Sequence, residues 1–281
     1  MAEGVQAMAE RVQDGLVQAA QVAREAAVRR APNGIAFAAY GETGVEDADL
    51  VRMVQTVPAA IAAALARTTY YFIPLALAGG RGSAPIGHRG GNEETTISPA
   101  YSAELAELAI CHRNVELGRD AGVGTEGREG VFISTRLLSD RFSLAFEFFI
   151  NVGHAFVDAV GVPESFSELV WGQAVADVRG ETSMDAWEGR AQAVGGGEAA
   201  QRGGRPRIDE KARTEYIEAA FSDAIAVYLL SLAVDFDYSE LREREYPLLA
   251  AQALAARLRM VARLFPQNAG YEFSIRYRRR G

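Results

Sequence analysis

GVFISTRLLSDRFSLAFEFFINVGHAFVDAVG, residues 130–161, is the stretch that decides how the fold of this chain is interpreted. Residues 131–134 are apolar and rich in β-branched and aromatic side chains, so they predict a short strand. From Phe142 to Val157 the chain is apolar around most of the circumference of a helix. A helix of that kind is normally buried. The stretch therefore predicts a short strand that leads into a long buried helix.

The polar residues of this helix form a single stripe. They are spaced 7, 4, 3 and 4 residues apart and comprise Asp140, Glu147, Asn151, His154 and Asp158. At roughly 100° per residue, this spacing places them in one narrow band along the helix. A buried helix with one acidic and imidazole stripe is either a hydrogen-bonded structural seam or a functional site.

A second long apolar segment, residues 208–236, predicts another buried helix, on which Glu218 and Ser222 lie one turn apart on the same face. The hydrophobic periodicity of the remaining sequence predicts helices over 4–30, 46–67, 99–117, 164–178 and 247–265. Residues 35–40 predict either a short strand or an apolar loop, and residues 68–78 predict a buried strand. The alternation of residues 271–277 favours a terminal strand, and Thr182 or Ser183 is expected to cap a short helix. The predicted fold class is mostly α, of the α+β kind, with a core around two buried helices.

The domain organisation follows from glycine content and amphipathicity. Residues 1–34 predict an N-terminal amphipathic helix that ends at Pro-Asn-Gly, and residues 35–281 predict a single globular α+β domain. Two glycine-rich stretches, 79–99 and 195–207, are expected to be flexible loops, and His88 in the first is expected to face solvent.

Composition limits the classes of function. The formal net charge is −8, which does not favour nucleic-acid binding, although Arg276, Arg278, Arg279 and Arg280 form a basic cluster that we interpret as a solvated tail. A single cysteine excludes an intramolecular disulfide and a zinc site made of several cysteines. The polar N-terminus does not resemble a signal peptide, and no uncharged apolar run reaches the ~20 residues of a membrane helix. We therefore expect a soluble, cytoplasmic protein that does not bind a membrane.

Two smaller groups of polar residues are interpreted as structural. Cys111 and His112 lie next to each other on the predicted helix 99–117, where neighbouring side chains point about 100° apart and do not converge on one atom. Four acidic residues spaced 4, 4 and 3 residues apart are expected to cap the short helix and to face water, namely Asp177, Glu181, Asp185 and Glu188.

The order of a short strand, a buried helix that ends in GHAFVD, and a later helix with EAAFSD resembles the gluzincin group of zincin metallopeptidases. The resemblance spans about residues 130–235. In that group the central helix carries H-E-x-x-H, whose two histidines bind zinc while the glutamate acts as general base. The resemblance places residues 150–154 at this motif, His154 at its second histidine and Glu218 at the third zinc ligand.

The motif is not intact. Ile150 stands where the first zinc ligand is required, and Asn151 stands where the general base is required. An aliphatic side chain cannot bind zinc, and a neutral amide cannot accept the proton of a metal-bound water. The resemblance therefore implies a zincin-like fold with a degenerate active site.

Three interpretations of the polar stripe remain. In the first, Asn151, His154 and Asp158 form a buried hydrogen-bond network. In the second, His154, Asp158 and Glu218 bind a metal ion, since His154 and Asp158 lie one turn apart. Glu147 lies seven residues before His154, about 10 Å along the helix, and is too distant to bind the same ion. The third is acid–base chemistry without a metal.

The sequence leaves three hypotheses of function. The first is a zincin-like protein without peptidase activity that binds a protein or peptide partner and has no cofactor. The second is a metal-dependent hydrolase that holds zinc at the noncanonical site of His154, Asp158 and Glu218. The third is a helical structural or assembly protein that forms a homo-oligomer through its N-terminal helix.

Overall fold

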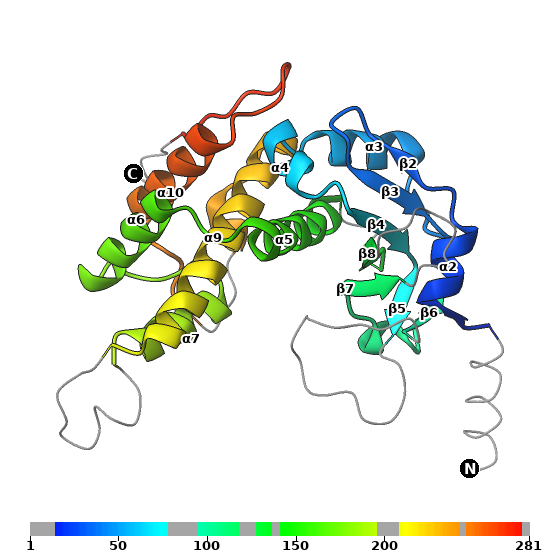
Figure 1. Ribbon diagram of the computed structural model, residues 1–281, viewed down its shortest axis with the longest axis horizontal. Helices are drawn as coiled ribbons and strands as arrows, with labels where there is room; N and C mark the ends of the chain where they lie inside the picture. The colour runs from blue at the N-terminus through cyan, green and yellow to red at the C-terminus, as the bar shows by residue number, and fades with distance from the viewer. Residues whose placement is uncertain are drawn as a thin grey trace, which may run out of the picture. The chain divides into compact units, whose positions relative to one another are not determined.

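The computed structural model describes residues 15–77, 95–117, 128–136, 141–195, 208–241 and 246–276. Their secondary structure is mostly α-helical, with short strands in two small sheets, and this is the fold class predicted from the sequence (Figure 1). His88, Asp140 and most of both predicted loops lie outside the described residues.

The described residues divide into two compact units. The single domain predicted over 35–281 stays a prediction. The first unit takes in the described residues of Met1–Gln55 and Leu65–Glu147, and the second those of Thr56–Ala64 and Phe148–Gly281. The boundary falls inside helix α5 (Arg141–Val160), which is the long helix of the opening stretch.

The first unit contains a five-stranded sheet of order β2-β3-β4-β8-β7. Its strands are β2 (Arg29–Arg30), β3 (Ala36–Ala39), β4 (Thr68–Ile73), β7 (His112–Leu117) and β8 (Arg128–Ser134). The three central strands are parallel, while β2 and β7 run antiparallel at the two edges. All six residues of β4 are buried, as its β-branched and aromatic sequence TTYYFI predicts.

A second sheet of the first unit has the order β1-β6-β5, with strands β1 (Val17–Gln18), β5 (Leu75–Leu77) and β6 (Thr96–Ser98). The predicted strand 68–78 is divided between the two sheets, because Pro74 interrupts it between β4 and β5. Helix α2 (Ala19–Glu25) packs its buried alanines and Val22 into a core that includes Tyr71 and Phe132, whose rings stack 4.8 Å apart.

Three expectations for the first 117 residues are wrong. The predicted helix over 4–30 is helical only at α2 among its described residues, since strand residues lie on both sides. The predicted helix over 46–67 is two helices, α3 (Asp47–Gln55) and α4 (Ala59–Ala64), because Pro58 cannot continue α3. The predicted helix over 99–117 is a 3-10 turn, η1 (Ala106–Leu108), followed by β7, because pairing with β8 outweighs the local helical pattern.

The second unit is built from helices. It contains residues 148–160 of α5, together with α6 (Glu164–Val175), α7 (Met184–Ala193), α9 (Glu210–Ala233) and α10 (Ala251–Leu264). Helix α9 contacts α6, α7 and α10, and Figure 1 shows these four helices beside one another. The 3-10 helix η2 (Tyr238–Leu241) follows α9.

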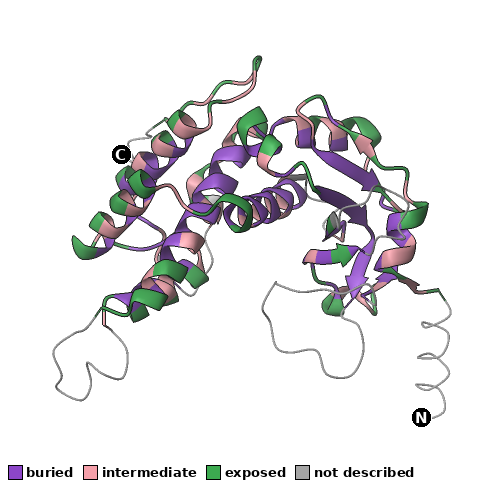
Figure 2. Cartoon of the chain, in the orientation of Figure 1, coloured by how far each residue is buried: buried purple, intermediate pink, exposed green. Residues whose placement is uncertain are grey.

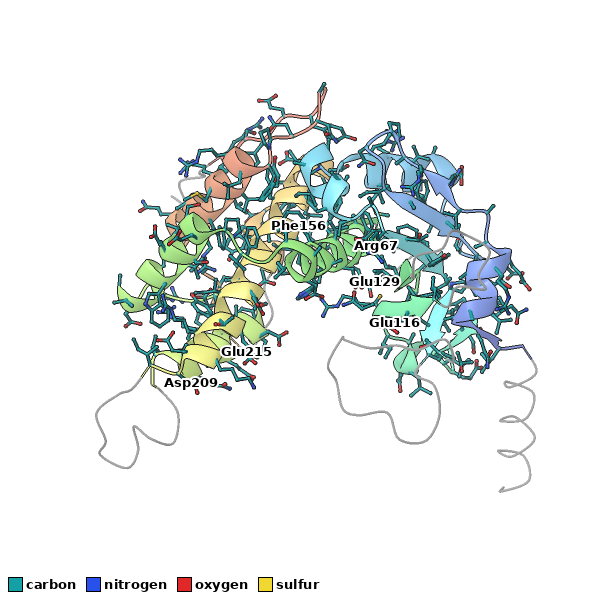
Figure 3. All side chains as sticks on the ribbon, viewed as in Figure 1. Arg67, Glu116, Glu129, Phe156, Asp209 and Glu215 are labelled. Carbon is teal, nitrogen blue, oxygen red and sulfur yellow. The ribbon has the colours of Figure 1, made fainter. Side chains whose placement is uncertain are left out.

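Local sequence sets the ends of these helices. Gly161, with a φ of +72°, ends α5, and Pro163 then begins α6. The Ser183 hydroxyl accepts a hydrogen bond from the Ala186 N–H, as predicted for the cap of the short helix α7. Asp209 caps α9 in the same way, and Figure 3 shows it at the start of that helix, before Glu215.

Helices α5 and α9 are the two long buried helices that the sequence predicts. Figure 2 shows that buried residues run along most of α9. By length and composition alone, Phe142–Val160 and Glu210–Ala233 are long and apolar enough to cross a membrane. More than half of the residues in each are buried inside the protein, which is the usual state of a core helix.

The C-terminal end of the described chain is held by Asn268. Its side chain accepts a hydrogen bond from the Ala59 N–H at 3.0 Å and donates one to the Val57 carbonyl at 2.9 Å, which caps α4 within the second unit. The strand predicted over 271–277 is wrong, because residues 271–276 have no regular secondary structure.

Candidate functional site

The polar stripe of α5 ranges from buried to exposed. Asn151 is only 5% exposed, whereas His154 is partly buried and Asp158 lies at the surface. On α9, Glu218 is partly buried and Ser222 is buried. Among the described residues, no group of three or more His, Cys, Asp or Glu side chains is arranged to hold a metal ion.

Gly153, which precedes His154, has a packing role. A Cβ atom at this position would lie 2.6 Å from the Ser222 carbonyl oxygen and 3.1 Å from the Ser222 hydroxyl. Contacts that short with backbone do not occur, so the glycine allows α5 and α9 to approach closely within the second unit. Part of the Gly-His pattern that resembles a metallopeptidase is therefore explained by helix packing.

Glu147, the first described residue of the stripe, belongs to the first unit and contacts Cys111. The Cys111 thiol donates a hydrogen bond to Glu147 Oε1 at 2.6 Å and accepts one from the Ser134 N–H at 3.3 Å. Burial raises the pKa of the Cys111 thiol well above its usual value, and the nearby Glu147 carboxylate raises the pKa further. Cys111 is therefore a neutral thiol, which agrees with the structural role expected from the sequence.

The most extensive buried polar cluster is in the second unit and is centred on Glu181 and Arg257, both fully buried. Arg257 Nη1 donates to Glu181 Oε2 at 2.9 Å, and its Nη2 donates to Glu181 Oε1 at 3.3 Å. The Tyr216 hydroxyl donates to Glu181 Oε1 at 2.6 Å, and Arg257 Nε donates to the Gln173 side chain at 2.8 Å. A bidentate ion pair with two further partners satisfies both charges away from water.

Burial by itself lowers the pKa of Arg257, but the adjacent Glu181 carboxylate outweighs it, so the net pKa is raised and the guanidinium stays charged. Burial likewise raises the pKa of Tyr216, which keeps the phenol protonated as a hydrogen-bond donor to Glu181. This cluster corrects a sequence expectation, because Glu181 does not face water. Asp177 and Asp185 are exposed, as expected.

Backbone geometry holds Glu181 in place. Its N–H donates to the Pro247 carbonyl at 3.0 Å, and its carbonyl accepts from the Leu249 N–H at 2.9 Å, which forms a one-residue bridge to the segment before α10. The preceding residue, Gly180, has a φ of +80°, and a Cβ there would lie 2.1 Å from the Leu248 carbonyl oxygen. Only glycine fits this approach.

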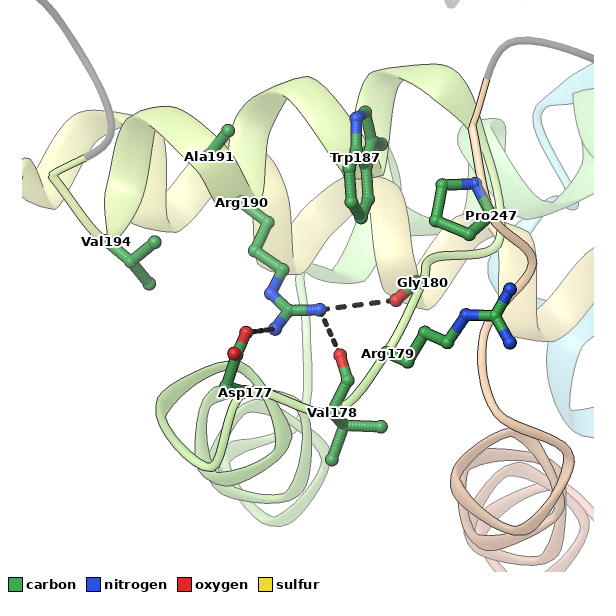
Figure 4. Close-up of a pocket in the computed structure, with 9 residues that line it drawn as sticks. All are labelled: Asp177, Val178, Arg179, Gly180, Trp187, Arg190, Ala191, Val194 and Pro247. Carbon is green, nitrogen blue, oxygen red and sulfur yellow. Dashed lines mark hydrogen bonds and ion pairs between the residues drawn. The ribbon is translucent and has the colours of Figure 1, made fainter.

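Arg190, on α7, joins the cluster to a pocket. Its guanidinium donates to the carbonyls of Val178 at 2.5 Å and Gly180 at 3.2 Å, pairs with Asp177 at 3.1 Å, and lies 3.5 Å from Glu181 (Figure 4). It thereby fixes the connection between α6 and α7, which forms one wall of the pocket. The pocket has a volume of about 370 Å³ and is lined by Asp177, Val178, Arg179, Gly180, Trp187, Arg190, Ala191, Val194 and Pro247.

The sequence did not predict this cluster, although one signal of it was present. Leu254, Leu258 and Val261 form the buried face of α10, and Arg257 falls on the same face by its 3–4 spacing. An arginine on an apolar helix face needs a buried carboxylate as partner. Its partner, Glu181, lies 76 residues earlier, and no local pattern connects the two.

Comparisons with known proteins give no relative: no protein family, no curated protein and no solved structure matches this chain. The described residues offer three chemically distinct places. These are the neutral thiol–carboxylate pair of Cys111 and Glu147, the polar stripe on α5, and the pocket beside the buried Glu181–Arg257 pair. Cys111, Glu181 and Arg257 each form hydrogen bonds with other groups of the protein, which is typical of a structural role.

Proposed function

We propose that this chain binds an extended segment of a partner protein along the edge strand β7 and does not hydrolyse it. The observation that carries the proposal is the position of β7 at the edge of the five-stranded sheet. Among the described residues, β7 pairs with β8 on one side and with no strand on the other. An edge strand of this kind can accept a further strand through main-chain hydrogen bonds.

The residues that lead into β7 support binding of apolar side chains. Tyr101, Leu108 and Ile110 are 54%, 63% and 40% exposed, and all three lie within ten residues of each other in the sequence. Large apolar side chains grouped at a surface are typical of interaction sites. We infer that the partner segment is extended and apolar at some of its positions.

The irregular start of β7 supports a binding role for this edge of the sheet. The register between β7 and β8 shifts between His112 and Val115, and Asn114 lies in the left-handed region with a φ of +53°. Such irregularities end continuous pairing and are frequent beside binding sites. Regular pairing then covers Val115–Leu117, where Glu116 lies opposite Glu129; Figure 3 labels both.

The absence of hydrolysis is proposed from the degenerate motif on α5. The resemblance to zincin metallopeptidases supports a binding role in place of catalysis, because Ile150 and Asn151 stand where that chemistry needs a ligand and a base. A zinc site at His154, Asp158 and Glu218 would contradict this proposal.

Fluorescein-labelled β-casein, an unfolded protein, is a suitable probe of both binding and cleavage. We expect its fluorescence anisotropy to rise as the protein is added, and we expect intact casein on a gel after prolonged incubation with added zinc. Cleavage that is absent from an Asn151→Ala control would overturn the non-peptidase part of the proposal. So would stoichiometric zinc in untagged protein that is lost on His154→Ala.

Leu108→Asp tests the location of the binding site. Because burial of a leucine contributes about 1.5–3 kcal/mol, we expect a loss of affinity for casein of roughly tenfold or more. Val175→Asp is the matched control, since Val175 is 67% exposed, similar to Leu108, but lies on α6 in the second unit. Equal affinities of the two variants would show that the segment before β7 is not the binding surface.

A further inference from the structure

The pocket of the second unit combines an aromatic wall with an exposed cation. Its volume of about 370 Å³ falls within the range of small-molecule sites, roughly 300–1,000 Å³. The wall on the α7 side contains Trp187, and the segment before α10 contributes Pro247. Figure 4 shows the indole of Trp187 extending from α7 on the side of the helix that faces Pro247.

Trp187 offers a ring face to a ligand. Its side chain is partly buried, so one part packs on the protein while another part borders the pocket. The Trp187 indole makes no hydrogen bond to another of the residues that the structure describes. Planar aromatic ligands stack favourably on an indole, and Val178 and Val194 add apolar surface to the same pocket.

The two arginines of the pocket have different surroundings. Arg190 is buried, and its guanidinium is used by two carbonyls and two carboxylates of the protein. Arg179 is exposed, and its guanidinium makes no hydrogen bond or ion pair with another described residue. Figure 4 shows the Arg179 side chain extending beside Pro247. Among the described residues, no carboxylate pairs with its charge at the pocket wall.

The local charge balance favours an anion. The pocket lining contains two guanidinium groups, on Arg179 and Arg190, and one carboxylate, on Asp177, which pairs with Arg190. The difference of one positive charge lies at Arg179. In a protein whose formal net charge is −8, a cationic pocket wall selects for a negatively charged group.

We propose that this pocket binds a small planar aromatic carboxylate. The ring lies against Trp187 and Pro247, and the carboxylate pairs with the Arg179 guanidinium, whose fork geometry suits a carboxylate. The site is independent of the proposed peptide site, because its residues belong to the second unit and β7 belongs to the first. Failure of one proposal therefore leaves the other unaffected.

Tryptophan fluorescence can report this binding directly. The chain has two tryptophans, Trp171 and Trp187, so Trp171→Phe leaves an emitter at the pocket and Trp187→Phe leaves one elsewhere. The probe is 4-nitrobenzoate, whose nitro group quenches indole emission, and 4-nitrobenzamide is its uncharged counterpart. We expect saturable quenching by 4-nitrobenzoate in the Trp171→Phe protein, and only linear collisional quenching in the Trp187→Phe protein and by the amide.

Arg179→Gln in the Trp171→Phe background tests the cation. Arg179 is exposed, so its replacement leaves the fold intact, which far-UV circular dichroism verifies. We expect the dissociation constant of 4-nitrobenzoate to rise at least fivefold, while Arg263→Gln, an exposed arginine on α10, leaves it unchanged. Quenching that is linear in both single-tryptophan proteins, or a dissociation constant unaffected by Arg179→Gln, would overturn the proposal.

Discussion

The polar stripe on α5 and the buried cluster around Glu181 are two ways in which this protein accommodates polar side chains among apolar helices. The stripe lies on one helix, and its described residues range from Asn151, 5% exposed, to Asp158 at the surface. The cluster is drawn from α6, α7, α9, α10 and the connection between α6 and α7, and Glu181 and Arg257 within it are both fully buried. The stripe can be seen in the sequence, and the cluster cannot.

The two regions also differ in how much stability is lost when one polar side chain is removed. Polar groups that reach the surface can exchange protein partners for water, so the loss of one of them is tolerated. A charge that is fully buried depends on its partner, because no water replaces it. We therefore expect the second unit to depend far more strongly on Glu181 and Arg257 than on His154 or Asp158 of the stripe.

Arg257→Met is expected to have the largest effect. It leaves the Glu181 carboxylate buried without its bidentate partner, and removal of one member of a buried pair costs about 3–5 kcal/mol. Urea unfolding followed by tryptophan fluorescence measures this, since Trp171 and Trp187 both lie in the second unit.

The double variant Glu181→Met, Arg257→Met is the control. Because it removes both charges and keeps similar volumes, we expect it to recover most of the lost stability. His154→Ala on the stripe is expected to cost less than about 1.5 kcal/mol, since His154 is only partly buried. A loss below about 1 kcal/mol for Arg257→Met would contradict the contrast between the two regions.

The sequence predicted those parts of the fold that depend on local patterns. The strand before α5, both long buried helices and the Ser183 cap follow from periodicity and capping chemistry within single segments. The helix expected over 99–117 was wrong because the partner of HRNVEL is β8, and strand pairing is decided by the sheet. The 3.6-residue period of the preceding AELAELA carried no information about that partner.

The candidate sites divide in the same way. Glu147, Asn151, His154, Asp158, Glu218 and Ser222 could be named because they share helix faces, but the contact between Glu147 and Cys111 crosses 36 residues and could not be derived. The pocket of Trp187 and Arg179 depends on the turn at Gly180 and on the bridge from Glu181 to the segment before α10. Neither the turn nor the bridge produces a periodic pattern in the sequence.

Gly153→Ala sharpens the comparison at the stripe itself. The added methyl group would lie 2.6 Å from a backbone oxygen of α9, so the helices must move apart, which costs about 2 kcal/mol. Gly172→Ala on α6 is the matched control, because nothing lies within 4 Å of a Cβ there, and we expect it to stabilise by about 0.5–1 kcal/mol. Stabilisation by both variants would show that α5 and α9 do not pack this closely.

Asp223 makes the stability of the second unit depend on pH. Burial raises the pKa of its carboxyl from 3.8 to about 6, although the Thr182 hydroxyl donates a hydrogen bond to it at 2.8 Å. The folded state then binds the proton more tightly than the unfolded state, so the unfolding free energy falls as pH rises from about 4 to about 6. Because the residue is only partly buried, we expect a loss of about 1.5 kcal/mol.

Asp223→Asn provides the reference curve, since asparagine has no charge to bury. We expect the difference in unfolding free energy between the variant and the original protein to grow from pH 4 to pH 6.5 and to be constant above it. Glu188→Gln, an exposed change on the adjacent helix α7, is expected to leave the curve unaltered. A pH-independent difference for Asp223→Asn would mean that its carboxyl has an ordinary pKa in the folded protein.

Cys111 reports on the first unit, which contains no tryptophan, and tests the smallest of the expected effects. Its buried, neutral thiol is expected to react with Ellman's reagent only when the unit opens, because the thiolate is the reactive form. Glu147→Ala removes the acceptor of the thiol hydrogen bond, which contributes about 1 kcal/mol, so the reaction should become roughly fivefold faster. Glu116→Ala, an exposed glutamate on β7, is expected to leave the rate within twofold. Equal rates for both variants would show that the hydrogen bond between Cys111 and Glu147 does not stabilise the first unit. Glu147 would then resemble the exposed residues of the stripe and differ from Glu181, whose partners are expected to contribute strongly to stability.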